Sequence, residues 1–251
     1  MVENILAVNS DEIPAPVTEV ARMACLDGIG VMIAGTREPM GLGRLVTEWV
    51  RDMGGTPEAG VAAGGFKVPA MNAAFANGTL AHALDFDVYQ HPRNHPMSPT
   101  LPAILALAEK RGHSGREVLS ALVVAFEVQY RLRSASNGLR PGKGFHKPGT
   151  IGTIGATAAC GWLLGLDPTQ FANAFGIAVS RAGSFQINTG TMTKSSHSGH
   201  AARMGVECAE LAARGWTASS GAFDEGGFFD TIVGEDQNPD LLVDDFGSPY
   251  S

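Results

Sequence analysis

Cysteine is scarce in this sequence, and its scarcity argues against several classes of small stabilised domain. The 251 residues include three cysteines, Cys25, Cys160 and Cys208, which lie far apart and follow no paired spacing. A disulfide framework needs an even set of cysteines, and a zinc ribbon needs closely spaced pairs. All three lie in apolar runs, where free thiols are usually buried, so we expect them to be structural.

Long apolar runs and an excess of basic charge are also missing. No uninterrupted apolar run approaches the ~20 residues that a bilayer-spanning helix needs, and no charged and then apolar leader opens the chain. The net charge is -7 and the pI about 5.5, which disfavours broad non-specific binding to nucleic acid or to an anionic membrane. A local basic pocket for an acidic substrate is still compatible with this charge. We therefore expect a cytoplasmic protein that binds neither nucleic acid nor membranes.

Alternating apolar and polar positions, which mark half-buried strands, are almost missing, whereas helical signals recur along the chain. Ser114-Gly-Arg-Glu117 is a capping box, and Asp167-Pro168 is a cap followed by a proline in the first turn. Glycine totals 32, and many interior positions are Gly or Ala, which lets helices pack closely. These features predict a compact all-α domain over residues 1–233, with a tail or linker over 234–251. The predicted helices span about 17–34, 45–53, 69–84, 99–110, 114–133, 167–181 and 198–214.

Six of the seven histidines lie in or just before three short segments. The segments are 85–95 with Asp85, Asp87, His91 and His95, 144–149 with His146, and 190–203 with Lys194, His197 and His200. The third segment has the composition of a Gly/Thr/Ser-rich loop that leads into a helix of small residues. Imidazoles beside a cation or a carboxylate suit proton transfer next to a substrate carboxylate. The clustering therefore indicates a site rather than surface decoration.

The first segment permits three interpretations. Its carboxylates and imidazoles could ligate a metal, could exchange protons, or could cap helix ends. Pro92 opposes an ordinary helix between His91 and His95, so the two rings need not share a face, which weakens the metal interpretation. A nucleotide loop at 149–155 is rejected, because the glycine spacing does not fit, no strand precedes it and no Walker lysine follows.

Lys194 is the strongest single candidate. Its compact charge could hold a carboxylate or stabilise an enolate-like intermediate, although most lysines are simply solvated. His146 precedes a helix start, where free amides favour an anion, and Lys143 and Lys147 lie beside it. The alternative for His146 is a surface loop histidine.

Longer blocks of the sequence match a family pattern in order. They are Ala74-Phe-Ala-Asn-Gly-Thr-Leu-Ala-His-Ala-Leu-Asp-Phe-Asp87, His95-Pro-Met-Ser-Pro99, Gly144-Phe-His146, Gly149-Thr-Ile-Gly152 and Gly190-Thr-Met-Thr-Lys194. With these blocks the chain resembles the MmgE/PrpD family from about Val17 to Phe229. The resemblance implies an all-helical N-terminal domain that usually dimerises, followed by a smaller α+β lid. It also implies reactions on small polycarboxylates without a metal or organic cofactor.

The resemblance also implies the site residues. By motif position, the family's active-site residues correspond to Asp85, Tyr89, His95, His146 and Lys194. We expect His95 to act as general acid or base, with Asp85 orienting it or bonding to the substrate. His146 and Lys194 would bind substrate carboxylates. Tyr89 would be a secondary donor; it stands, after Val88, where the family commonly has an Asp and then a Thr. The substrate-binding set is Tyr89, His146, Lys194 and His197.

The resulting hypothesis is a lyase resembling 2-methylcitrate dehydratase, acting on a di- or tricarboxylate. The alternatives are an enzyme similar to cis-aconitate decarboxylase, one similar to iminodisuccinate epimerase, or a non-catalytic helical dimerisation module. The last arises because the sequence stops at Ser251, before the family's lid and its further catalytic Lys and His. The expected partners are a small polycarboxylate and a second copy of the chain, with a separate lid polypeptide as a further alternative.

Overall fold

Helices account for most of the chain in a computed structural model that describes residues 1–136, 144–233 and 237–250. The elements are α1 (Val2–Leu6), α2 (Ala15–Gly35), α3 (Leu42–Met53), β1 (Ala59–Gly60), β2 (Lys67–Val68), α4 (Ala70–Ala81), α5 (Met97–Arg111), α6 (Gly115–Ala135), α7 (Lys147–Leu163), α8 (Pro168–Arg181), η1 (Gln186–Asn188), α9 (Met192–Ala213), η2 (Phe229–Val233) and η3 (Pro239–Leu242). Lys143 and the predicted boundary between residues 233 and 234 involve residues outside the described ranges, and that boundary stays a prediction.

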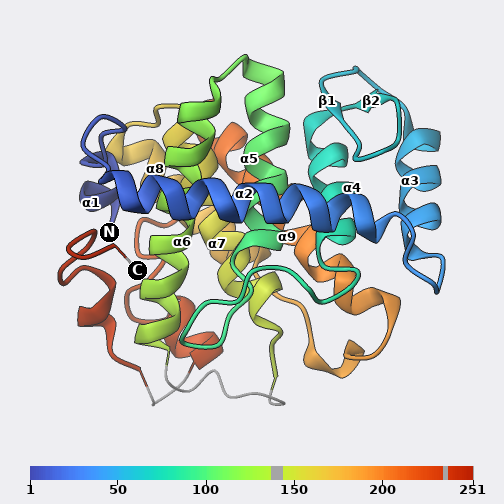
Figure 1. Cartoon of the computed structure of the whole chain (residues 1–251). Helices are drawn as coiled ribbons and strands as arrows, with labels where there is room; N and C mark the ends of the chain where they lie inside the picture. The colour runs from blue at the N-terminus through green and yellow to red at the C-terminus, as the bar shows by residue number, and fades with distance from the viewer. Residues whose placement is uncertain (137–143, 234–236, 251) are drawn as a thin grey trace.

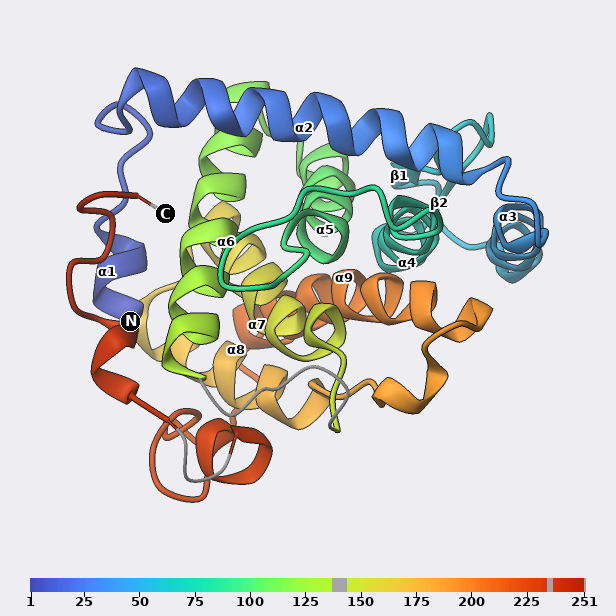
Figure 2. The same ribbon diagram turned by 60° about the horizontal axis from the view of Figure 1, so that its bottom comes forward.

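The helices are arranged in layers around α7 and α9. Figure 2 shows α2 along one edge, then α4, α5 and α6, and then α7, α8 and α9 beyond them. The two short strands form one antiparallel hairpin, in which Ala59 lies opposite Val68. Both predicted caps are present, since Ser114 and Asp167 each form a capping box at the start of α6 and α8. The predicted all-α fold is confirmed.

Small residues set the distance between α4 and α9. A Cβ atom on Gly78 would lie 2.9 Å from the Cα atom of Gly199, and one on Gly199 would lie 2.2 Å from the hydroxyl oxygen of Thr79. Any larger side chain at this crossing would push the two helices apart. The crossing matters for the site, because the end of α4 and the start of α9 both carry site residues.

The predicted start of α9 was wrong by about two turns. The segment from Met192 to His197 is helical, so Lys194 and His197 lie in the first turns of α9 rather than in a loop. Serine and threonine side chains here bond to the backbone within the helix, as when Ser196 Oγ donates to the carbonyl of Thr193 at 2.8 Å. As a result Lys194 and His197 are three residues apart on a helix, where their side chains are neighbours.

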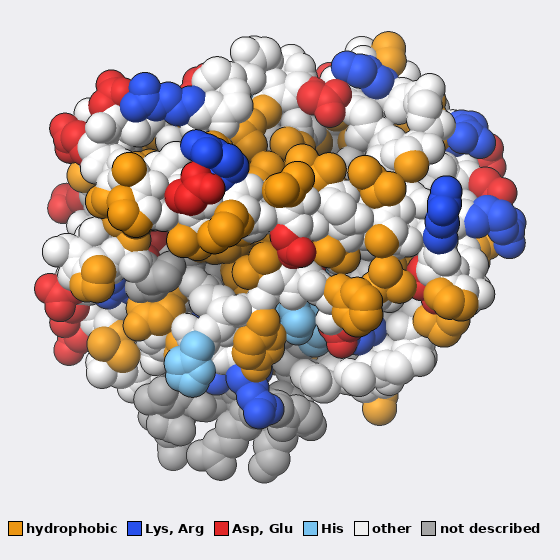
Figure 3. Space-filling model, viewed as in Figure 1, with side chains coloured by type: hydrophobic (Ala, Val, Ile, Leu, Met, Phe, Trp, Pro, Cys, Tyr) orange, Lys and Arg blue, Asp and Glu red, His pale blue; other side chains and the backbone are white. Residues whose placement is uncertain are grey.

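The outer side of α2 is unusually apolar. Its exposed large side chains are Val20, Met23, Leu26, Ile29 and Ile33. Figure 3 shows apolar side chains gathered over this part of the molecule, which lies in front in Figure 1. No helix in the described ranges has the length and apolarity to cross a membrane. The homodimer expected from the sequence stays a prediction.

The described part of the C-terminal segment packs against α6. Arg131 Nη2 donates to the carbonyl of Asp245 at 2.6 Å, and the amide of Gly247 donates to Glu127 Oε1 at 3.0 Å. Leu242 in η3 is buried in the same apolar cluster as Leu132. Residues 237–250 are therefore held to the helical domain in this structure.

Candidate active site

The three histidine-containing segments converge at one end of the bundle. Ser195 Oγ in α9 donates to the carbonyl of His82 at 3.3 Å, which joins the start of α9 to the end of α4. The ring of His146, at the start of α7, lies with its centroid 5.5 Å from that of His82 and 5.2 Å from that of His197. Residues more than 100 positions apart thus meet, which the clustering in sequence only suggested.

Asp87 is the buried anchor of the cluster. Its Oδ1 atom accepts a hydrogen bond from His82 Nδ1 at 2.9 Å and lies 3.4 Å from His95 Nδ1. Burial opposes ionisation of Asp87, but the hydrogen bonds and charges of His82 and His95 outweigh it and hold the pKa of this carboxyl well below its usual range. In return, although burial opposes it, the carboxylates of Asp87 and Asp85 raise the pKa of His95. His95 is therefore biased toward the protonated form.

Asp85 and Lys194 form an ion pair at the more exposed edge of the cluster. Lys194 Nζ lies 2.7 Å from Asp85 Oδ1, and the same oxygen lies 3.9 Å from His95 Nε2. Burial opposes ionisation of Asp85, but Lys194 and the neighbouring imidazoles lower the pKa of this carboxyl. The backbone of Asp85 is left-handed, with φ of 57°, a conformation that non-glycine residues hold mainly where the surroundings require it. The loop is thus shaped to direct this carboxylate at Lys194.

His146 and His197 form a pair of buried imidazoles. Their Nδ1 atoms are 3.1 Å apart, so one ring donates a hydrogen bond and the other accepts it. Burial, aided by the positive charges of His82, His197 and Lys194, lowers the pKa of His146 to about 3. Burial first, and then neighbouring positive charge, lowers the pKa of His197 to about 4. Both rings are neutral near pH 7, so each can donate one hydrogen bond and accept another without carrying charge.

A cavity of about 160 Å³ opens beside these histidines. The described residues that line it are Tyr89, Arg93, Asn94, His95, His146, Lys147, Pro148 and Gln186. The ring of Tyr89 packs edge-on against His95, with centroids 5.3 Å apart, and the phenol is half-exposed. His197 lies behind His146 rather than along this cavity, and Lys194 is joined to it through Asp85 and His95. The predicted substrate-binding roles of His197 and Lys194 stay predictions.

The position of His95 is fixed by amide hydrogen bonds from α6. Asn94 Nδ2 donates to Gln129 Oε1 at 3.1 Å, and Gln129 Nε2 donates to the carbonyl of Pro96 at 2.9 Å. Gln129 therefore grips the chain on both sides of His95, just before α5 begins. Such support restricts the ring to the orientation that reaches Asp85 and Asp87.

The structure changes the set of residues that could ligate a metal ion. His82, Asp85, Asp87 and His95 present ligand atoms within 4.8 Å of one another, whereas the predicted member His91 is exposed and lies outside this group. The Asp85 carboxylate already contacts the ammonium group of Lys194, so a divalent cation here would lie close to a positive charge. The arrangement suits proton sharing better than metal binding.

Sequence reasoning overlooked the central residue His82, and it considered Asp87 within the first histidine segment but not among the expected active-site residues. His82 appeared only within a family block, yet its ring is fully buried and contacts both Asp85 and Asp87. His82 Nε2 and Asp87 Oδ2 are buried and have no hydrogen-bond partner among the described residues. The spacing of a histidine three and five residues before two aspartates was the available signal. His200 lies about one turn after His197 in α9 and contacts the carbonyl of Arg181 at 3.3 Å.

The sequence of the chain matches a known protein family and several characterised proteins. Residues 1–240 match the MmgE/PrpD N-terminal domain. A cis-aconitate decarboxylase from Homo sapiens is 41% identical over 168 residues, which cover 64% of this chain and 35% of that protein. One from Mus musculus is 38% identical over 181 residues, covering 70% and 37%, and one from Aspergillus terreus is 31% identical over 229 residues, covering 87% and 46%.

These matches cover a larger share of this chain than of the relatives. This chain spans between about a third and a half of the length of the curated relatives that it matches. The family match, however, runs over nearly all of this chain and includes the three segments that build the site. The chain belongs to the MmgE/PrpD family.

Proposed function

We propose that this chain is the helical part of a lyase that acts on a small polycarboxylate, and that the reaction is decarboxylation of a cis-aconitate-like substrate. The observation that carries the proposal is that His95 and His146 line one cavity beside the Asp85–Lys194 ion pair, with pKa values shifted in opposite directions. The pKa of His95 is raised through Asp87 and Asp85, whereas burial lowers the pKa of His146 to about 3. Titratable neighbours whose pKa values are pushed apart are typical of acid and base partners.

The roles follow from these protonation states. When the bond to a departing carboxyl carbon breaks, CO₂ leaves and the electron pair spreads toward a remaining carboxylate. Lys194 would stabilise that negative charge, and protonated His95 would deliver a proton to carbon. Asp85 and Asp87 would hold His95 in its charged form. Neutral His146, held by His197 through its Nδ1 atom, would bind the substrate as an uncharged hydrogen-bond donor.

Decarboxylation replaces dehydration as the favoured reaction because of the relatives. The sequence alone favoured a 2-methylcitrate dehydratase, but the similar proteins named above are cis-aconitate decarboxylases. Both reactions need an acid, a base and a cation near a carboxylate, so the site geometry supports either. An epimerase would use the same groups but would leave the mass of its substrate unchanged.

The test is proton NMR of the purified chain in D₂O with cis-aconitate, 2-methylcitrate, citrate or iminodisuccinate. We expect new vinylidene signals and CO₂ release from cis-aconitate, with deuterium on the protonated carbon. Water loss from 2-methylcitrate would instead restore the dehydratase assignment. A folded chain that neither turns over nor exchanges deuterium with any of the four would contradict the proposal and favour a non-catalytic helical module.

A further inference from the structure

Two cations line the site cavity without a carboxylate partner among the residues that the structure describes. Arg93 and Lys147 lie along the cavity with His95 and His146. Neither forms an ion pair with an aspartate or glutamate among the described residues, in contrast to Lys194, which pairs with Asp85. In a chain of net charge -7, a carboxylate for these groups is not scarce, so their lack of one calls for a ligand.

A third cation stands behind them. Arg133, near the end of α6, donates from Nη1 to the carbonyl of Ser136 at 2.8 Å, and its Nε atom is buried with no hydrogen-bond partner among the described residues. Burial of Lys147, with the charges of Arg133 and Arg93 close by, lowers the pKa of Lys147. Like charges held together in a partly buried place repel one another, and a bound anion would relieve that repulsion.

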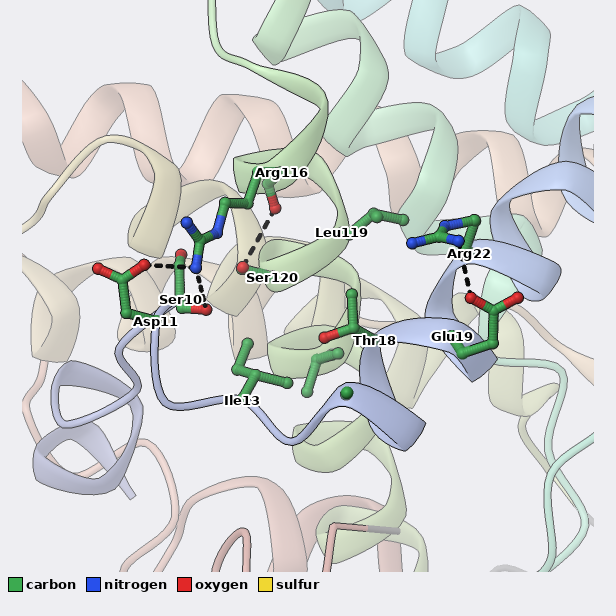
Figure 4. A pocket seen from close by; sticks show the side chains of 11 residues that line it. Ser10, Asp11, Ile13, Thr18, Glu19, Arg22, Arg116, Leu119 and Ser120 are labelled. Carbon is green, nitrogen blue, oxygen red and sulfur yellow. Dashed lines mark hydrogen bonds and ion pairs between the residues drawn. The ribbon is translucent and has the colours of Figure 1, made fainter.

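A larger cavity elsewhere gives the contrast. About 330 Å³ in volume, it lies between residues 10–13, α2 and α6, and its arginines are Arg22 and Arg116 (Figure 4). Arg22 pairs with Glu19 at 2.8 Å, and Arg116 pairs with Asp11. The arginines of that cavity pair with carboxylates of the chain itself, whereas no carboxylate in the described ranges pairs with Arg93 or Lys147.

The position of Lys147 adds to the same field. It is the first residue of α7, a helix of 17 residues whose N-cap is His146. The dipole of the helix places partial positive charge at this end, which adds to that of the two side chains. Arg93 approaches from the segment between α4 and α5, so the cavity is bounded by cations from two separate elements.

We propose that Arg93 and Lys147, backed by Arg133, form a second carboxylate subsite that holds a carboxylate of the substrate that does not react. The inference rests on the proposed function, since it places the substrate with its reacting end at His95 and Lys194. It makes the pocket selective for tricarboxylates, because a dicarboxylate held at His95 and Lys194 leaves the two cations unsatisfied. An arginine and a lysine suit this task, since both bind carboxylates by charge-assisted hydrogen bonds.

The experiment uses binding and does not depend on turnover. Calorimetry would measure the affinity of the purified chain for propane-1,2,3-tricarboxylate and for pentanedioate, which lacks the central carboxylate. We expect Arg93→Gln and Lys147→Gln each to weaken tricarboxylate binding about tenfold, and the double variant more, as loss of a charged hydrogen bond implies. Binding of pentanedioate should change less than about threefold by the same reasoning. Arg22→Gln, in the other cavity, is the matched control and should leave both affinities unchanged.

The outcomes separate the subsite from the reaction. Equal loss of both ligands, or no loss of either, overturns the subsite. Selective loss of the tricarboxylate in a chain with no turnover upholds the subsite and removes the lyase assignment. If the chain turns over cis-aconitate and neither substitution changes the rate, the lyase assignment is upheld and the subsite is overturned. Thermal unfolding of each variant shows whether it has folded, and both side chains are accessible enough for the substitutions to be tolerated.

Discussion

Two clusters of ionisable side chains in this molecule differ in how completely opposite charges are paired. Away from the site, Glu210 in α9 lies 2.8 Å from Lys110 Nζ and 3.1 Å from Arg111 Nη2, and Lys110 also contacts Glu58 at 3.2 Å. Each carboxylate there faces a cation from another element. At the site, two imidazoles face each other, and one aspartate lies against two histidines. Some buried polar atoms there have no hydrogen-bond partner among the described residues.

The difference suggests that the Glu210 cluster serves stability and that the histidine cluster serves function. Opposite charges that satisfy one another hold α5, α9 and the chain before β1 together, and nothing about them invites a ligand. Buried imidazoles whose charged forms are disfavoured do not hold elements together by ion pairing, and they make the fold sensitive to acid. The two clusters should therefore respond in opposite ways to mutation and pH.

The largest effect expected at the site is on turnover. Lys194→Ala should lower kcat/KM by ~10³-fold, because it removes the charge that stabilises the developing anion. Its melting temperature should fall by only a few degrees, since its partner Asp85 is half-exposed and such pairs contribute little. Steady-state kinetics on cis-aconitate and thermal unfolding measure the two quantities. Lys67→Ala, which breaks the exposed pair with Glu109, is the matched control and should change neither much.

The second cluster should respond in the opposite way. Glu210→Ala leaves Lys110 and Arg111 without their shared carboxylate and should cost about 3 kcal/mol of unfolding free energy, as breaking a buried ion pair does. For a chain of this size that is a drop of about 6–12 °C in melting temperature. Activity per folded molecule should be unchanged. If turnover fell as far as it does in Lys194→Ala, the separation of the two clusters would be wrong.

The free energy of unfolding should depend on pH through the buried histidines of the site. The pKa of His146 is lowered to about 3 and that of His197 to about 4, so the unfolded chain binds more protons than the folded one below pH 6.5. Their contribution is complete above pH 6.5 and is lost as pH falls toward 4. His95 has the opposite shift, so its contribution is complete below pH 6.5 and is lost as pH rises through its folded pKa.

Denaturant unfolding between pH 7 and pH 4 tests this window. In His146→Gln the decline should be shallower by on the order of 2 kcal/mol at pH 4, since one acid-sensitive ring is gone. His113→Gln is the control, because His113 is paired with Glu117 outside the site. An unchanged slope in His146→Gln would mean that the buried imidazole pair does not set the acid sensitivity.

Local signals in the sequence were sufficient for much of the fold. The capping boxes at Ser114 and Asp167 involve residues three apart, so they could be recognised without any tertiary information. The start of α9 could not be recognised from local signals. Its serines, threonines and glycines have the composition of a loop, but Gly199 packs on α4 and that contact favours a helix here. Tertiary packing overrode local preference.

The site was predicted in part for the same reason. Asp85, His95, His146 and Lys194 were identified through their residue types and the family pattern, and the structure brings them together. The contacts of His82 with Asp87 depend on where α4 ends, and α4 ends at Ala81 rather than near Leu84 as predicted. A histidine just inside the expected helix end therefore did not stand out. Arg93 was overlooked because an exposed arginine has no local mark of function.

The smallest expected effect concerns Tyr89, the outermost residue of the site. Its phenol is half-exposed and its ring packs edge-on against His95, so ring and hydroxyl can be separated by two substitutions. Tyr89→Phe keeps the ring and should raise KM for cis-aconitate by roughly threefold, the loss of one accessible hydrogen bond. Tyr89→Thr also removes the ring contact and should widen the cavity. If the ring limits substrate size, Tyr89→Thr alone will turn over a substrate with an extra methyl group, measured as kcat/KM for 2-methylcitrate or a methylated aconitate. Equal effects of the two variants would assign the role of Tyr89 to its hydroxyl, and would leave the paired cations and carboxylates of the inner site as the sole determinants of size.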